Sequence, residues 1–258
     1  MPFKKTVTLD SGLLLGSGLP KVCVPVIGRN ENEFLHNVHL ACVSKPDLIE
    51  LRIDCLPDCM EMTSLPDYLQ TCLKEVHRIC PAILTYRTEH DGGNGRDGLY
   101  LSVLEHILNA RLSVDLLDIE INAGHQVFDK LCNLSHLQHI PVIASWHNFG
   151  FTPAADELVR CFETMQTWHA DIAKIAVMPE TPDDVSVLCC AAQTADRLLS
   201  IPHIAISMGP LGTKTRTECE RFGSCLTFAS AGSASAPGQI SVDAVRAALI
   251  QTHEEQKG

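Results

Sequence analysis

The strand-and-helix unit that best reveals the fold occupies residues 172–199, IAKIAVMPETPDDVSVLCCAAQTADRLL. Its first six residues are apolar except for Lys174, and a run of this length and composition is typical of a buried β-strand. Thr181 and Pro182 then indicate the start of a helix, because proline at the first helical position loses no hydrogen bond. This stretch therefore predicts one strand followed by one helix.

The same alternation of short apolar runs and amphipathic stretches recurs along the whole chain. The runs predict eight strands, at residues 21–27, 47–54, 82–87, 116–121, 141–147, 172–177, 203–208 and 225–229. The stretches that follow them predict eight helices, at residues 31–43, 64–78, 98–110, 123–134, 153–168, 181–199, 215–222 and 241–256.

Eight such repeats in about 240 residues match the size of an α/β fold of one type, the parallel (β/α)8 or TIM barrel. An open doubly wound sheet more often has five or six strands, and no G-x-G-x-x-G motif opens the first helix. Two alternating runs around residues 10–12 predict an N-terminal β-hairpin that caps the bottom of the barrel. We therefore expect one domain, residues 1–258, with the hairpin cap in residues 1–20 and the barrel in residues 21–258.

Composition excludes several classes of function. The chain has 258 residues, 45% of them hydrophobic and 20% charged, so it is long and apolar enough to bury a full core. Its net charge is -11 and no cluster of basic residues stands out, which argues against nucleic-acid binding. Apolar runs end well short of the roughly 20 residues of a membrane span. We expect no membrane segment and a cytoplasmic location.

The 12 cysteines are scattered through apolar runs in a chain too long to need disulfides for stability. We interpret them as buried free thiols. Cys55 and Cys59 form a close pair, but no second pair with partner histidines follows at the spacing of a zinc site. The sequence therefore predicts no structural metal.

Two predicted strands place polar residues two positions apart, which puts both side chains on one face. Glu50 and Arg52 have this spacing, and so do Ser145 and His147 near the end of a later strand. In a (β/α)8 barrel the functional residues lie at the carboxyl ends of strands, so these pairs are candidates for the site. The alternative interpretations are a structural ion pair for Glu50 and Arg52 and a structural role for His147.

Lys174 is the most informative residue, because it interrupts an otherwise apolar strand. Desolvation there favours the neutral amine, which can attack a carbonyl to form a Schiff base. The alternative is a lysine whose ammonium extends out to solvent, for which an interior barrel strand leaves little room.

Three loops add further candidates. Arg87 ends a strand and precedes a turn that contains Glu89 and Asp91. Arg216 follows the seventh strand and could hold a substrate carboxylate as a bidentate pair, although a lone loop arginine is more often a solvated surface residue. Residues 235–239, SAPGQ, have a composition suited to a lid.

These motifs together resemble the type I 3-dehydroquinate dehydratases, from about residue 21 to the C-terminal helix. The segments that carry the resemblance are IELRID at residues 49–54, SWHNF at 145–149, KIAVMP at 174–179, FGS at 222–224 with TF at 227–228, and SAPGQ at 235–239. Five weak motifs in the right order make a coincidence implausible.

The resemblance implies a (β/α)8 enzyme that converts 3-dehydroquinate to 3-dehydroshikimate and water in the shikimate pathway. Lys174 would form the imine, and His147 would be the general base and acid of a syn elimination. The same resemblance gives Asp91 the task of orienting His147, and it implies substrate contacts for Glu50, Arg52, Arg87, Arg216, Ser235 and Gln239. It also implies a homodimer that needs no cofactor or metal.

The chain departs from the family pattern at two positions. Asp91 stands where the family has a glutamate that orients the histidine, and Thr215 stands where a serine is usual. Because aspartate is one methylene shorter, either Asp91 reaches His147 by a small loop shift or the histidine is held less well. Glu89 is a possible substitute two residues away. Two other functions stay open: a Schiff-base aldolase acting on a sugar phosphate, and a degenerate barrel that binds such ligands without turnover.

Overall fold

The computed structural model describes residues 5–56, 64–231 and 240–257. Eight parallel strands form one sheet in the order β10-β3-β4-β5-β6-β7-β8-β9. Their bounds are β3 Lys21–Val26, β4 Leu48–Arg52, β5 Ala82–Thr85, β6 Leu116–Glu120, β7 Val142–Asn148, β8 Ile172–Val177, β9 His203–Ser207 and β10 Leu226–Phe228. The edge strands β9 and β10 are joined by a parallel bridge between His203 and Ser224, so the sheet closes into a barrel. The predicted fold class is confirmed.

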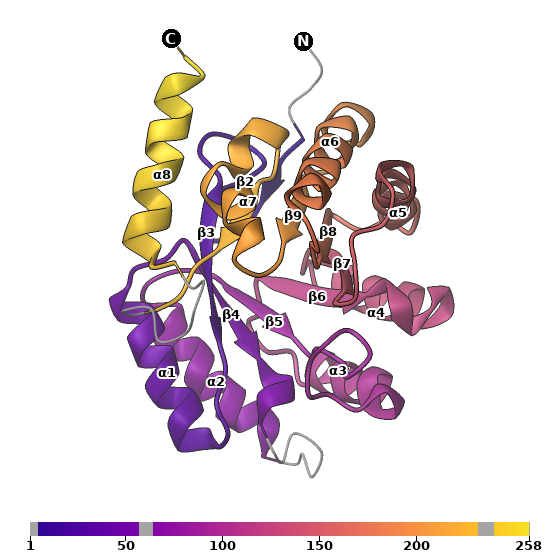
Figure 1. The fold of residues 1–258 in the computed structure, drawn as a ribbon. Coiled ribbons are helices and arrows are strands. Elements are labelled where there is room, and N and C mark those ends of the chain that lie inside the picture. The colour runs from indigo at the N-terminus through magenta and orange to yellow at the C-terminus, as the bar shows by residue number, and fades with distance from the viewer. Residues whose placement is uncertain (1–4, 57–63, 232–239, 258) are drawn as a thin grey trace.

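Helices surround the strands on the outside (Figure 1). They are α1 Glu31–Val43, α2 Leu65–Val76, α3 Tyr100–Asn109, α4 His125–His136, α5 Ala155–Thr167, α6 Pro182–Leu198, α7 Lys214–Thr217 and α8 Val242–Glu255. The capping box of Thr181 and Asp184 starts α6, at the position that the sequence indicates. No helix of the described residues is long and apolar enough to cross a membrane.

The helix predicted at residues 215–222 is wrong. The chain instead forms the four-residue α7 and then the 3-10 helix η5, Cys219–Phe222, with a break at Glu218. Threonine hydroxyls compete with the helical hydrogen bonds here, because Thr215 Oγ1 donates to the carbonyl of Gly212 and Thr217 Oγ1 to that of Thr213. Gly223, with a φ of 81°, ends the segment in the left-handed region.

A short antiparallel hairpin, β1 Val7–Thr8 and β2 Leu14–Leu15, precedes the barrel. Leu9 and Leu15 of this hairpin are buried in one cluster with the inward-facing residues near the beginnings of the barrel strands. Those residues include Leu48, Leu116 and Ile172. The hairpin therefore closes the N-terminal end of the barrel, as predicted.

The cysteines of the described residues are free thiols, and Cys59 lies outside those residues. The prediction of buried thiols is correct for Cys23 and Cys225 but wrong for Cys190, which is exposed. Cys189 and Cys190 are adjacent on α6, where successive side chains point about 100° apart. Only one face of that helix packs against the barrel, so the two thiols differ in exposure.

Candidate active site

The barrel interior changes from apolar to polar at one level. On β4 to β8 the first inward-facing residues are apolar and belong to the cluster beneath the hairpin, Leu48, Ile83, Leu116, Ile143 and Ile172. Two residues later on each strand, on the same face, the side chains are polar: Glu50, Thr85, Asp118, Ser145 and Lys174. The next inward positions carry Arg52, Arg87, Glu120 and His147. Polar groups therefore gather at the carboxyl ends of the strands, where barrel enzymes have their active sites. We call these inward-facing polar side chains the polar layer.

Lys174 lies between two carboxylates in this polar layer. Its Nζ donates a hydrogen bond to Asp118 Oδ2 at 3.2 Å and lies 3.7 Å from Glu50 Oε1. The ring of Phe228 lies on another side, 4.7 Å from Nζ. Only 6% of the side chain is exposed, so the lysine does not extend to solvent. The strand pattern predicts the burial of Lys174 but not its two carboxylate neighbours.

Arg87 connects the side chains of the polar layer by hydrogen bonds. Its guanidinium donates to Asp118 Oδ1 at 2.8 Å, to Glu120 Oε1 at 2.9 Å and to Ser145 Oγ at 2.8 Å. The side chain is only 4% exposed, and it is committed to these partners. Burial would raise the pKa of Asp118, but Arg87 and Lys174 outweigh it and hold that pKa well below its usual range. Asp118 is therefore an anion that bridges Arg87 and Lys174.

The shorter carboxylate of Asp91 does reach His147. Asp91 Oδ2 lies 3.2 Å from His147 Nδ1, and the Asp91 side chain is fully buried. Asp91 therefore makes the contact that the first of the two alternatives requires, whereas Glu89 is exposed. An ionised carboxylate only accepts hydrogen bonds, so Nδ1 of His147 carries the proton and Nε2 is the free lone pair.

The surroundings of His147 keep its ring neutral. Burial, with a further contribution from the positive charge of Arg87, lowers the pKa of His147 to about 3. Its ring stacks on Phe149, with centroids 6.3 Å apart. Within the described residues Nε2 has no hydrogen-bond partner. A neutral imidazole with a free nitrogen at the mouth of the barrel can accept a proton from a bound molecule.

Glu50 and Arg52 face the interior as the spacing predicts, but they do not form an ion pair with each other. Arg52 makes a bidentate pair with Asp54, with both N–O distances 2.8 Å. Glu50 instead accepts from Thr85 Oγ1 at 2.8 Å and faces Lys174. The structural-pair alternative for Glu50 and Arg52 is therefore wrong.

Arg216 forms no ion pair with an acidic side chain of the described residues. Its Nη1 donates to the carbonyl of Ser207 at 3.1 Å, and none of the ion pairs among residues 5–56, 64–231 and 240–257 includes it. Burial lowers the pKa of Arg216. The adjacent Thr215 is buried and binds the Ser207 backbone N–H through its hydroxyl at 2.9 Å, so the change from serine keeps the hydrogen bond. Arg216 is thus placed to receive an external carboxylate.

A comparison with known families decides the identity of this arrangement. Residues 22–256 match the family described as type I 3-dehydroquinase. The chain belongs to this family. That span includes the barrel strands, except for the first residue of β3, and every candidate residue of the site.

Solved and curated members of the type I 3-dehydroquinases are similar over nearly the whole chain. The 3-dehydroquinate dehydratase of Clostridium kluyveri is 39% identical over 232 residues, which cover 89% of this chain and 91% of that protein. The crystal structure of the Clostridium difficile enzyme with covalently modified comenic acid has a TM-score of 0.92 at 34% identity and covers 98% and 100% of the two chains. The Geobacillus kaustophilus enzyme has a TM-score of 0.90 at 31% identity, with 97% of each chain covered.

Two predicted contacts of the family site, Ser235 and Gln239, lie outside the described residues. Asp118 and Glu120, by contrast, belong to the polar layer but were not among the sequence candidates. Glu120 accepts hydrogen bonds from Thr88 N at 2.9 Å and Thr88 Oγ1 at 2.6 Å, and it thereby anchors the loop that carries Asp91. Both acids have the two-residue spacing within a predicted strand that identified Glu50 and Arg52, so the same rule finds them.

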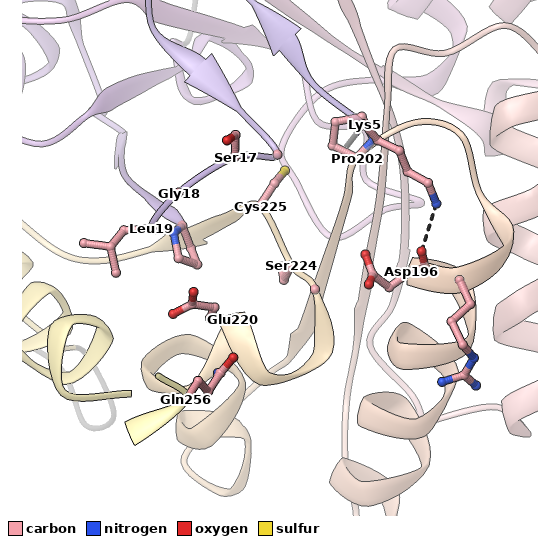
Figure 2. Close-up of a pocket in the computed structure, with 14 residues that line it drawn as sticks. Lys5, Ser17, Gly18, Leu19, Asp196, Pro202, Glu220, Ser224, Cys225 and Gln256 are labelled. Carbon is pink, nitrogen blue, oxygen red and sulfur yellow. Dashed lines mark hydrogen bonds between the residues drawn. The ribbon is translucent and has the colours of Figure 1, made fainter. Parts of the chain in front are cut away.

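A separate cavity of about 570 Å³ lies at the opposite, hairpin end of the barrel (Figure 2). Residues just before the strands line it, including Pro20, Pro202 and Cys225, and Lys5 donates to the carbonyl of Asp196 across it. It shares no residue with the polar layer. The described residues contain no group of three or more His, Cys, Asp or Glu side chains arranged to hold a metal ion.

Proposed function

We propose that this chain is a 3-dehydroquinate dehydratase that works through an imine on Lys174. The observation that carries the proposal is the buried Lys174, held between Asp118 and Glu50, in a barrel whose mouth holds the neutral base His147. The membership in the type I 3-dehydroquinases supports the reaction: water is eliminated from 3-dehydroquinate to give 3-dehydroshikimate, in the shikimate pathway.

In the first step the Lys174 amine, in equilibrium with its ammonium, adds to the C3 ketone and water leaves. The resulting iminium withdraws electrons from C2 and makes its proton acidic. Asp118 and Glu50, within 3.7 Å of Nζ, then stabilise the positive charge that persists on nitrogen. The covalently modified comenic acid in the Clostridium difficile relative is in keeping with covalent chemistry in this family.

In the second step His147 Nε2 removes the C2 proton and the electron pair moves into an enamine. The enamine expels the C1 hydroxyl, which takes the proton from the imidazolium and leaves as water; the use of one base on one face makes the elimination syn. A low pKa for His147 makes its imidazolium a strong acid for this proton return. Water then hydrolyses the imine, and Lys174 is regenerated.

The remaining site residues bind and orient the substrate. Arg216, which lacks an anionic partner among the described residues, would take the substrate carboxylate. Glu50 and Arg52 would contact ring hydroxyls. Arg87, with its donors committed to Asp118, Glu120 and Ser145, would serve mainly to hold the site together. Ser235 and Gln239 stay predicted contacts, and the homodimer and cytoplasmic location stay predictions.

The binding-only alternative was based on the shorter Asp91, and the 3.2 Å contact with His147 removes its basis. The aldolase alternative needs a phosphate site for which the described residues offer no specific observation.

Borohydride trapping tests the proposal directly. The protein is incubated with 3-dehydroquinate and sodium borohydride, and peptide mass spectrometry locates any adduct, while turnover is followed by the ultraviolet absorbance of 3-dehydroshikimate. We expect an adduct on Lys174 and turnover, both lost in Lys174→Ala. An adduct on another residue, or turnover that survives Lys174→Ala, would overturn the imine mechanism. Cleavage of sugar phosphates without turnover of 3-dehydroquinate would favour the aldolase.

A further inference from the structure

The carboxylate of Asp91 has a partner on each oxygen. Oδ2 faces His147, while Oδ1 accepts a hydrogen bond of 2.7 Å from Nδ2 of Asn122. The Asn122 contact is the shorter of the two by half an ångström, which is the geometry of a strong amide-to-carboxylate hydrogen bond. No step described above uses Asn122.

Asn122 is an exposed residue directly after a barrel strand. It lies in the 3-10 helix η3, Ile121–Ala123, which follows β6 without a gap. Gly124, with a φ of 88°, turns the chain into α4, and its N–H donates to the carbonyl of Ile121 at 3.0 Å. The strand before it carries Asp118 and Glu120, so Asn122 is positioned by the same element that organises Lys174 and the Asp91 loop.

The geometry of aspartate explains why such an anchor matters. The terminal torsion of an aspartate is a broad rotor, so one hydrogen bond alone leaves the carboxylate free to turn. Turning moves Oδ2 away from His147, whose ring then loses its orienting acceptor. A hydrogen bond to Oδ1 stops this rotation. The family pattern has a longer glutamate at this position, and aspartate reaches His147 only at 3.2 Å, so little displacement can be tolerated.

His90 is the other neighbour of Oδ1, with Nδ1 at 3.2 Å. Asn122 and His90 are both exposed, so solvent competes with each of them. Asn122 is the stronger anchor because its contact with Oδ1 is 2.7 Å long, against 3.2 Å for His90. The amide of Asn122 does not titrate, so it is always a donor to the Asp91 carboxylate.

We propose that Asn122 is a positioning residue for the dehydration: it locks the Asp91 carboxylate so that the shorter acid can orient His147 in the place of the family's glutamate. This inference rests on the proposed function, because it gives Asn122 its effect through the base His147. Asn122 acts on proton transfer and not on the imine, which Lys174 forms on the other side of the site.

The test is a double-mutant cycle of Asn122→Ala and Asp91→Glu, with Asn133→Ala on the surface of α4 as the matched control. In the aspartate background we expect Asn122→Ala to lower kcat about 10-fold with KM little changed. This is the size of effect that follows when a hydrogen-bond partner that orients a functional side chain is lost. In the Asp91→Glu background the longer side chain reaches His147 without this anchor, so the same substitution should cost less than about 2-fold. Asn133→Ala should leave kcat unchanged.

Three further measurements distinguish a positioning role of Asn122 from a structural role and from failure of the proposed function. Borohydride trapping on Lys174 should persist in Asn122→Ala, whereas absence of the adduct from the unmodified chain would refute the proposed function itself. In Asn122→Asp the new side chain has the same shape as asparagine but repels Asp91, so this variant should lower kcat more than Asn122→Ala. It replaces the alanine variant in the test if that variant does not fold. Equal losses in both backgrounds, an unchanged kcat, or a larger loss for His90→Ala than for Asn122→Ala would overturn the proposal.

Discussion

Replacing Arg216 by methionine tests the carboxylate clamp in isolation. Methionine keeps much of the length of the side chain but removes the charge, together with one hydrogen bond to the Ser207 carbonyl. A bidentate, charge-assisted pair is worth about 3 kcal/mol. Since 1.4 kcal/mol is a factor of about 10, we expect kcat/KM for 3-dehydroquinate to fall about 100-fold.

The same variant should not lose stability. Among the described residues Arg216 has no anionic partner, and burial leaves its charge poorly solvated and lowers its pKa. Steady-state kinetics and thermal unfolding of Arg216→Met, compared with Arg221→Met, measure both effects. Arg221 is exposed and pairs with Glu218 and Glu255, so its removal should leave kcat/KM unchanged. An unchanged kcat/KM together with a lowered Tm in Arg216→Met would refute the reasoning.

Three other predictions concern buried charge. Because His147 must be neutral to act as base and burial lowers its pKa to about 3, the acid limb of kcat/KM should lie below about pH 5; a limb near pH 6.5 would contradict this. Burial also lowers the pKa of His203 from 6.5 to about 4. As pH falls, the histidine of the unfolded chain therefore binds a proton before that of the folded protein. The contribution of His203 to the free energy of unfolding is full above pH 6.5 and is lost as pH falls towards 4. That loss is about 2 kcal/mol between pH 7 and 5; urea unfolding of His203→Gln should show a smaller pH dependence, and an identical one would exclude His203 as its cause. Asp118→Asn leaves Arg87 and Lys174 with one anion fewer and should cost about 3 kcal/mol in urea unfolding, whereas Asp129→Asn on exposed α4 should cost little; equal effects would show that the buried anion is not stabilising.

The barrel and the inward-facing catalytic candidates could be predicted because both depend on period-two patterns within single strands. His147 is found through its two-residue spacing from Ser145 on one strand face, and Lys174 because it is the one charged residue in an otherwise apolar strand. Applied to β6, the same rule identifies Asp118 and Glu120 without any knowledge of tertiary structure.

Contacts between loops could not be predicted in this way. The hydrogen bond from Asn122 to Asp91 joins residues 31 positions apart, in two loops whose approach depends on how β5 and β6 lie in the closed barrel. The break at Glu218 could not be predicted because two features of this short segment favour different structures. The spacing of its apolar residues favours a continuous helix, whereas the hydrogen bonds of its threonine hydroxyls to nearby carbonyls interrupt the helix. The partners of Lys174 were missed because a strand pattern shows burial but not the charges on neighbouring strands.

The hairpin that closes the bottom of the barrel makes the reaction chamber blind-ended. Leu9 and Leu15 fill the end away from the catalytic layer, and an apolar layer lies between them and Lys174. In the part of the barrel that the structure describes, Lys174 is therefore reached from the carboxyl ends of the strands, and substrate and product must pass there. A molecule that merely sits across these strand ends, without touching Lys174, blocks arrival and departure together, and enzyme already loaded with product stays trapped until the blocker leaves.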